Sequence, residues 1–143
     1  MADNNRATPK MRNFARRLIA HETRESKSSG TKIPVPFPVV GKLLPHLTIL
    51  MGTGGVRALL SRALALAGAE VPWLRGLHIK ADGTLEGLDE LEAKVDPEEF
   101  AEGRVVLLAQ LLGLLVAFIG EILTLRLAKE VWPKVSLDDL DFE

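Results

Sequence analysis

The stretch "LLAQLLGLLVAFIGEILTLRLA", residues 107–128, is the most apolar part of the chain and decides which kind of fold the sequence encodes. It is either a membrane segment or the central helix of a small soluble domain. A helix that spans a bilayer needs about 20 apolar residues. Only sixteen uncharged residues separate Arg104 from Glu121, and extending the span to Arg126 would bring a costly carboxylate into the membrane. The sequence favours a buried helix, and membrane insertion of residues 105–126 is the alternative.

One face of this predicted helix is small and mildly polar. Small residues spaced four apart let a second helix approach closely. Glu121 falls on or beside the same face, since successive helical residues are rotated by about 100°. Its carboxylate either accepts a hydrogen bond from Arg57 or Arg62, or it points outward through a gap. The residues expected in this helix-packing contact are Ala109, Gly113, Ala117 and Glu121.

Signals at both ends extend the helix over residues 97–132. Asp96 can cap it, Pro97 suits its first position, and two glutamates follow at the positive end of the helix dipole. Trp132-Pro133 ends it. Three glycines inside the segment are candidate bends, namely Gly103, Gly113 and Gly120.

The preceding residues predict further helices and one hairpin. Pro45 should kink or divide the apolar segment 39–51, and "GTGG" should separate it from the Ala- and Leu-rich helix 56–69. Residues 77–86 alternate around Asp82-Gly83, a pair that suits a two-residue hairpin turn with positive φ angles. The fold class predicted is mainly α: a compact helical bundle around the long central helix 97–132, with a small β-hairpin.

Composition limits the function classes. The chain of 143 residues suits one domain and has no cysteine, which excludes disulfides, thiolate metal sites and cysteine nucleophiles. The first 13 residues are polar and lack the apolar core of a secretory signal, so we expect a cytoplasmic protein, with membrane association as the alternative.

Charge divides the chain into a basic arm and an acidic body. Residues 1–32 carry eight Lys/Arg against three Asp/Glu, a net +5, and the remaining residues carry ten against sixteen, a net −6. Such an arm either meets an anionic partner or folds back on its own acidic surface, and the second is favoured. The predicted organisation is a basic amphipathic helix at 1–27, a Ser/Gly/Pro tether at 28–38, the helical bundle at 39–133 and an acidic tail at 134–143.

Two segments are candidates for binding a protein partner. The first helix brings three arginines together, and the tail "SLDDLDF" resembles a short docking peptide with apolar anchors. Nucleic-acid binding is disfavoured, because the arginines lack interleaved aromatic residues beyond Phe14 and the whole chain is slightly acidic. The candidate partner-binding residues are Arg12, Arg16, Arg17, Leu137, Leu140 and Phe142.

A weak anion-binding candidate lies in "GTGGVR". Glycines that lead into a helix can expose backbone N–H groups to an anion, but no phosphate-loop lysine follows here, and a plain helix corner is favoured. The three histidines are scattered, no nucleophile elbow is present, and we expect no metal, no cofactor and no enzymatic activity. The anion-binding candidates are Thr53, Gly54, Gly55 and Arg57.

The segments "RALLSRALALA", "EVPWL", "DGTLEGL" and "LLAQLLGLLVAFIGEILTLRLAKEVWP" resemble an uncharacterised group of small bacterial helical proteins over residues 40–135. The resemblance implies a bacterial, intracellular setting and carries over no functional residue. The function predicted is a non-enzymatic interaction or regulatory module that associates with itself or with a protein partner. The alternative is a membrane-active protein that inserts residues 105–126 as an oligomeric helix bundle.

Overall fold

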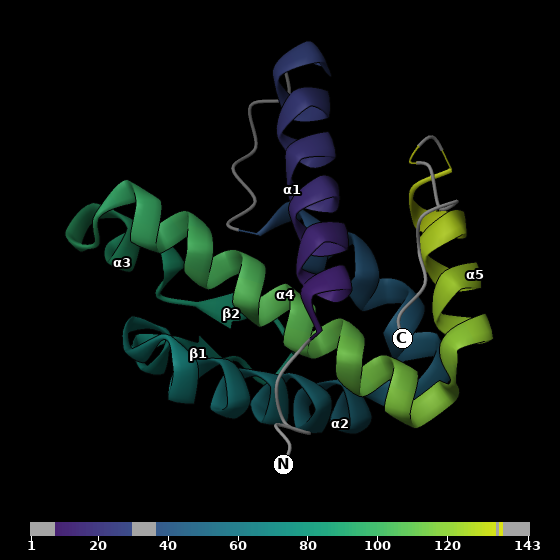
Figure 1. The fold of residues 1–143 in the computed structure, drawn as a ribbon. Coiled ribbons are helices and arrows are strands. Elements are labelled where there is room, and N and C mark those ends of the chain that lie inside the picture. The colour runs from purple at the N-terminus through teal and green to yellow at the C-terminus, as the bar shows by residue number, and fades with distance from the viewer. Residues whose placement is uncertain (1–7, 30–36, 134, 136–143) are drawn as a thin grey trace.

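The computed structural model describes residues 8–29, 37–133 and 135 (Figure 1). Within these residues the chain is helical almost throughout, with one short antiparallel hairpin. The predicted fold class, a mainly α helical bundle with a small β-hairpin, is therefore confirmed. In chain order the elements are α1 (Pro9–Ser29), α2 (Pro38–Glu70), the 3-10 helix η1 (Pro72–Gly76), β1 (His78–Ile79), β2 (Leu85–Glu86), α3 (Leu88–Lys94), α4 (Pro97–Ile119) and α5 (Glu121–Val131).

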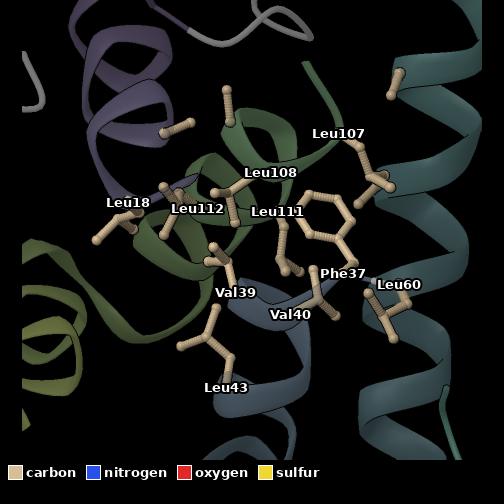
Figure 2. Packing of buried hydrophobic residues seen from close by; sticks show 14 of the residues in the cluster. Leu18, Phe37, Val39, Val40, Leu43, Leu60, Leu107, Leu108, Leu111 and Leu112 are labelled. Atoms are coloured by element: carbon tan, nitrogen blue, oxygen red, sulfur yellow. The ribbon is translucent and has the colours of Figure 1, made fainter. Parts of the chain in front are cut away.

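Helix α4 lies between α1 and α2 and packs against both (Figures 1 and 2). Every residue from Val105 to Leu112 is buried, so the helix is covered on all sides in its middle turns. A helix that is apolar all round is stable in water only when neighbours cover each face. The prediction of a buried central helix is confirmed over α4.

The long helix predicted over residues 97–132 is wrong beyond residue 119. It begins at Pro97 as expected, although the Asp96 side chain makes no capping hydrogen bond. At Gly120 the backbone turns to φ 91° and ψ 160°, and α5 leaves in a new direction (Figure 1). Glycine adopts this left-handed φ without the steric cost that a Cβ adds. The other two candidate bends, Gly103 and Gly113, stay helical.

Helix α2 also bends at a glycine. The sequence predicts a kink or division at Pro45, but the helix continues past this proline. The kink lies at Gly52, which has φ 76° and ψ 165°, and residues 53–55 of the predicted "GTGG" break are helical. The two halves of α2 run in different directions, blue before the kink and teal after it (Figure 1).

The hairpin forms where the sequence predicts it, with a different turn. His78 pairs with Glu86 and Ile79 with Leu85. The Gly83 N–H donates to the Lys80 carbonyl at 2.9 Å, and Gly83 alone in the loop has a positive φ, of 90°. This is a three-residue loop in which a turn is followed by a left-handed glycine, rather than a two-residue turn with positive φ at Asp82 as well.

The hydrophobic core joins α1 to the rest of the bundle. Leucine and valine side chains from α1, α2 and α4 meet at its centre (Figure 2). The sequence sets residues 1–27 apart as a unit of their own, but Met11, Phe14 and Leu18 are buried in the same core as α4. Of the predicted tether, residues 28 and 29 belong to α1, and 30–36 lie outside the described residues.

A buried carboxylate ties three helices together at one end of this core. Glu22 of α1 is 4% exposed and accepts a hydrogen bond from the buried Trp132 indole N–H at 2.8 Å. Its Oε2 also lies 2.6 Å from the Lys42 Nζ of α2. A buried charge is tolerated when it is paired and hydrogen-bonded. Glu22 therefore fixes α1 against α2 and against the end of α5.

Gly103 is the position of closest approach between α4 and η1. A Cβ added there would lie 2.3 Å from Cζ2 of Trp73. The indole cannot move away easily, because its N–H donates to the Glu99 carbonyl at 3.1 Å and its ring stacks on Phe100 at 5.1 Å. At Gly113 an added Cβ would lie 3.4 Å from the Met11 sulfur, an ordinary contact with a flexible side chain.

We expect Gly103→Ala to lower the free energy of unfolding by about 1–3 kcal/mol, because the added methyl overfills the site. Gly113→Ala is the matched control, since replacing a helical glycine by alanine gains up to about 1 kcal/mol where space allows. Urea denaturation followed by circular dichroism measures both. Equal stabilities of the two variants would show that Trp73 does not hold its place against α4.

We also expect Glu22→Met to destabilise the chain by about 1–3 kcal/mol, because it leaves the buried Trp132 N–H without an acceptor. Glu102→Met, which removes an exposed carboxylate, is the control and should cost no more than about 1 kcal/mol. Thermal unfolding of the two variants compares them directly. A loss at Glu22 no larger than that at Glu102 would contradict the structural role of the buried carboxylate.

Candidate functional site

Five large apolar side chains are exposed in the described part of the chain, at between 50% and 85% of their surface. Two of them come just before the Gly52 kink of α2, and three flank the Gly120 break between α4 and α5. We call this set the apolar corner. Its members are Ile49, Leu50, Phe118, Ile122 and Leu123.

The two halves of the apolar corner lie at the same end of the molecule. The first half of α2 runs antiparallel to α5: Lys42 and Trp132 share the Glu22 carboxylate, and His46 Nδ1 lies 3.8 Å from Glu130 Oε1. Because the two helices run antiparallel, the α2 residues just before Gly52 lie on the side of the first turns of α5. Figure 1 shows the α2 kink and the α4–α5 break at one end of the bundle.

The size of the apolar corner makes it a candidate contact surface. A large side chain offers on the order of 200 Å² when uncovered, so five that are half exposed or more offer on the order of 600 Å². Patches of this size on soluble proteins are commonly sites of protein or membrane contact. This surface was not among the contact sites predicted from the sequence. The signal available was a glycine next to large apolar residues, at Leu50-Met51-Gly52 and at Phe118-Ile119-Gly120-Glu121-Ile122.

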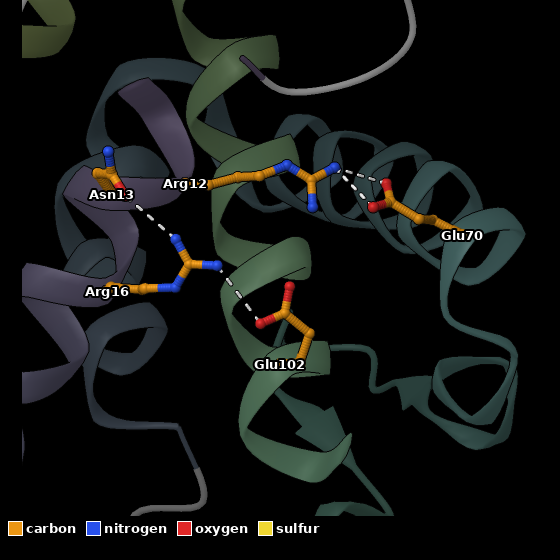
Figure 3. Close-up of polar contacts among 5 residues, drawn as sticks. All are labelled: Arg12, Asn13, Arg16, Glu70 and Glu102. Carbon is orange, nitrogen blue, oxygen red and sulfur yellow. Dashed lines mark hydrogen bonds and ion pairs between the residues drawn. The ribbon is translucent and has the colours of Figure 1, made fainter. Parts of the chain in front are cut away.

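Among the candidate partner-binding residues, Arg12 and Arg16 form ion pairs with described residues of the same chain (Figure 3). Arg12 Nη2 lies 2.7 Å from both carboxylate oxygens of Glu70. Arg16 Nη2 lies 3.5 Å from Glu102, and its Nη1 donates to Asn13 Oδ1 at 3.1 Å. These are the contacts expected if the basic arm folds back on acidic residues of its own chain.

The remaining partner-binding candidates are placed differently. Arg17 is exposed on α1. The three candidates of the acidic tail lie outside the described residues, namely Leu137, Leu140 and Phe142.

The anion-binding candidates lie in the first turns of α2 after its kink. Thr53, Gly54 and Arg57 are exposed, and Gly55 is half-buried against the Met51 side chain. They follow the apolar corner directly in the sequence. Among the residues that the structure describes, no group of three His, Asp or Glu side chains could hold a metal ion.

The predicted helix-packing face is divided by the Gly120 break. Ala109 is buried and Gly113 faces Met11 of α1, whereas Ala117 is exposed. Glu121 is half-buried and belongs to α5, so it no longer continues the α4 face. Of the two alternatives for Glu121, the ion pair with Arg57 or Arg62 does not form among the described residues.

Two helices are long and apolar enough to cross a membrane, by length and composition alone. They are residues Val39–Glu70 and Pro97–Ile119, with mean hydropathies of 1.3 and 1.9 in their most apolar windows. Only 22% of the first window is buried in the bundle, against 56% of the second. Core helices of soluble proteins pass the same test, so this finding is weak evidence for membrane insertion.

Comparison of the chain with protein-family models, with curated proteins and with solved structures gave no match. The resemblance to a group of small bacterial helical proteins stays a prediction.

The two arginine pairs of α1 should differ in their contribution to stability. We expect Arg12→Met to cost about 1–3 kcal/mol, since its partner Glu70 is only 26% exposed and loses a charge-assisted bond. Arg16→Met should cost at most about 1 kcal/mol, because both members of that pair are half exposed. Denaturant titration at low and high salt tests this order. The reverse order would mean that the Arg12–Glu70 pair does not anchor α1.

Proposed function

We propose that the protein is a non-enzymatic interaction module that associates with itself through the apolar corner. The observation that carries the proposal is the exposure of five large apolar side chains at one end of the bundle. Water contact with this surface is unfavourable, and burial against a second surface would recover the hydrophobic free energy. Stable protein interfaces bury about 800 Å² per partner, which is close to what this surface and its margins offer.

A second copy of the chain is the partner that this surface suits best. Two copies related by a twofold axis present the same patch to each other, so one apolar surface covers the other. The margin of the corner on α5 carries both signs of charge, since Glu121 is half-buried and Arg126 is exposed. A mixed margin suits a protein surface, whereas anionic bilayers attract clusters of Lys and Arg.

Membrane binding is the second candidate function, favoured by one observation. The first apolar window, in α2, is only 22% buried although its composition suits a membrane. The membrane alternative predicted from the sequence inserts residues 105–126 as one helix. The Gly120 break makes that segment two helices, so insertion would have to begin from α2, α4 or the corner itself.

The proposal predicts a specific change of oligomeric state. The full chain, purified without detergent, should elute as a dimer or a larger defined species in size exclusion with light scattering. Phe118→Ser combined with Ile122→Ser should convert it to a monomer, since both side chains lie in the apolar corner. Glu90→Ser combined with Lys94→Ser changes two exposed residues of α3, away from the corner, and should leave the mass unchanged.

A monomeric parent chain would overturn self-association. Flotation with vesicles of neutral and anionic lipid tests the membrane-binding alternative. Co-flotation of the parent chain that is lost in the Phe118→Ser, Ile122→Ser variant would assign the apolar corner to a membrane instead.

A further inference from the structure

A groove separates α1 from the N-terminal half of α4, away from the apolar corner. Its volume is about 340 Å³, within the range of small-molecule sites. Its apolar walls are formed by Ile19 and Ala20 of α1 and by Ala101 and Val105 of α4. This is the volume of about ten water molecules, comparable to that of a short hydrocarbon chain. The walls therefore suit the apolar part of a small ligand.

Arg104 also lines this groove. Its guanidinium carbon lies 5.6 Å from the ring centre of Phe37 and 5.5 Å from that of Phe100. It makes no hydrogen bond or ion pair with any residue that the structure describes, and its Nε is buried without an acceptor. Burial lowers the pKa of Arg104, and the nearby Glu92 carboxylate opposes that shift.

An arginine held in this way is suited to bind an anion. Guanidinium groups stay charged at neutral pH, and a partly desolvated cation that forms no ion pair with the described residues attracts an anion. The guanidinium carbon lies against both phenyl rings, and Arg104 also lines the groove. A carboxylate can accept two parallel hydrogen bonds from a guanidinium group.

The other charges around the groove limit the ligand to a single negative charge. Glu98 and Glu102 of α4 also line it and would repel a polyanion such as a polyphosphate. Glu102 is partly compensated by Arg16, at 3.5 Å (Figure 3). Both members of this pair are about half exposed, so the contact can rearrange at little cost when a ligand enters.

We propose that the groove between α1 and α4 binds an amphipathic monocarboxylate, with its carboxylate on Arg104 and its alkyl chain along Ile19, Ala20, Ala101 and Val105. A free medium-chain fatty acid has this chemistry. The site goes beyond the interaction function proposed above. It uses none of the residues of the apolar corner, so each can fail without the other.

Calorimetric titration of the full chain with decanoate, below its micelle concentration, tests the site. Decanoate should bind the parent chain, and decanol, which has the same alkyl chain without the charge, should bind at least about tenfold more weakly. Arg104→Met keeps an apolar stem between the two phenyl rings and removes the charge. It should weaken decanoate binding at least about tenfold.

Two further variants keep the test decisive. Ala101→Phe fills the groove from an exposed helical position and should abolish binding even if Arg104→Met does not fold. Phe118→Ser alters the apolar corner and should leave decanoate affinity unchanged. The proposal is overturned if decanoate does not bind, if decanol binds as tightly, or if Ala101→Phe retains the parent affinity. If Phe118→Ser alone loses decanoate binding, the ligand binds at the apolar corner, and the proposal is overturned as well.

Discussion

The structure depends on covering α4 on every side. Its middle turns, Val105 to Leu112, are apolar apart from the buried Gln110, so neighbouring helices must enclose them. Helix α2 covers one side and α1 another (Figure 2). This requirement brings α1 into the core, although its charge and the following Ser/Gly/Pro segment make it look independent. Its arginines then find acidic partners on α2 and α4.

Two glycines set the shape of the rest. Gly52 and Gly120 adopt left-handed φ values and turn apolar helices that would otherwise continue in a straight line. Each turn lets the chain fold back onto the core. Each also leaves large side chains beyond the covered region, and these make up the apolar corner. The geometry that closes the bundle thus creates the surface on which the proposed self-association rests.

Two charged side chains next to the core, the buried Glu22 and the half-buried Arg104, have different surroundings. Glu22 has two donors and holds three helices together, which is the expected state of a buried charge in a stable fold. Arg104 lies against two aromatic rings without an acceptor among the described residues. A partly buried cation that forms no ion pair with the described residues suits an external anion, which the proposed ligand would supply. Glu22 therefore has a structural role, whereas Arg104 is suited to bind a ligand.

Local signals and hydrophobic periodicity were enough to predict the helical class, the start of α4 at Pro97, the position of the hairpin and a buried helix within residues 107–128. Where that long helix breaks depends on how the helices pack. Gly103, Gly113 and Gly120 look alike in sequence, and Gly103 stays helical where it meets Trp73, whereas Gly120 turns the chain. The apolar corner, the Glu22 contacts and the isolation of Arg104 also depend on residues far apart in the chain. Their positions follow from how the helices pack, which no local pattern specifies.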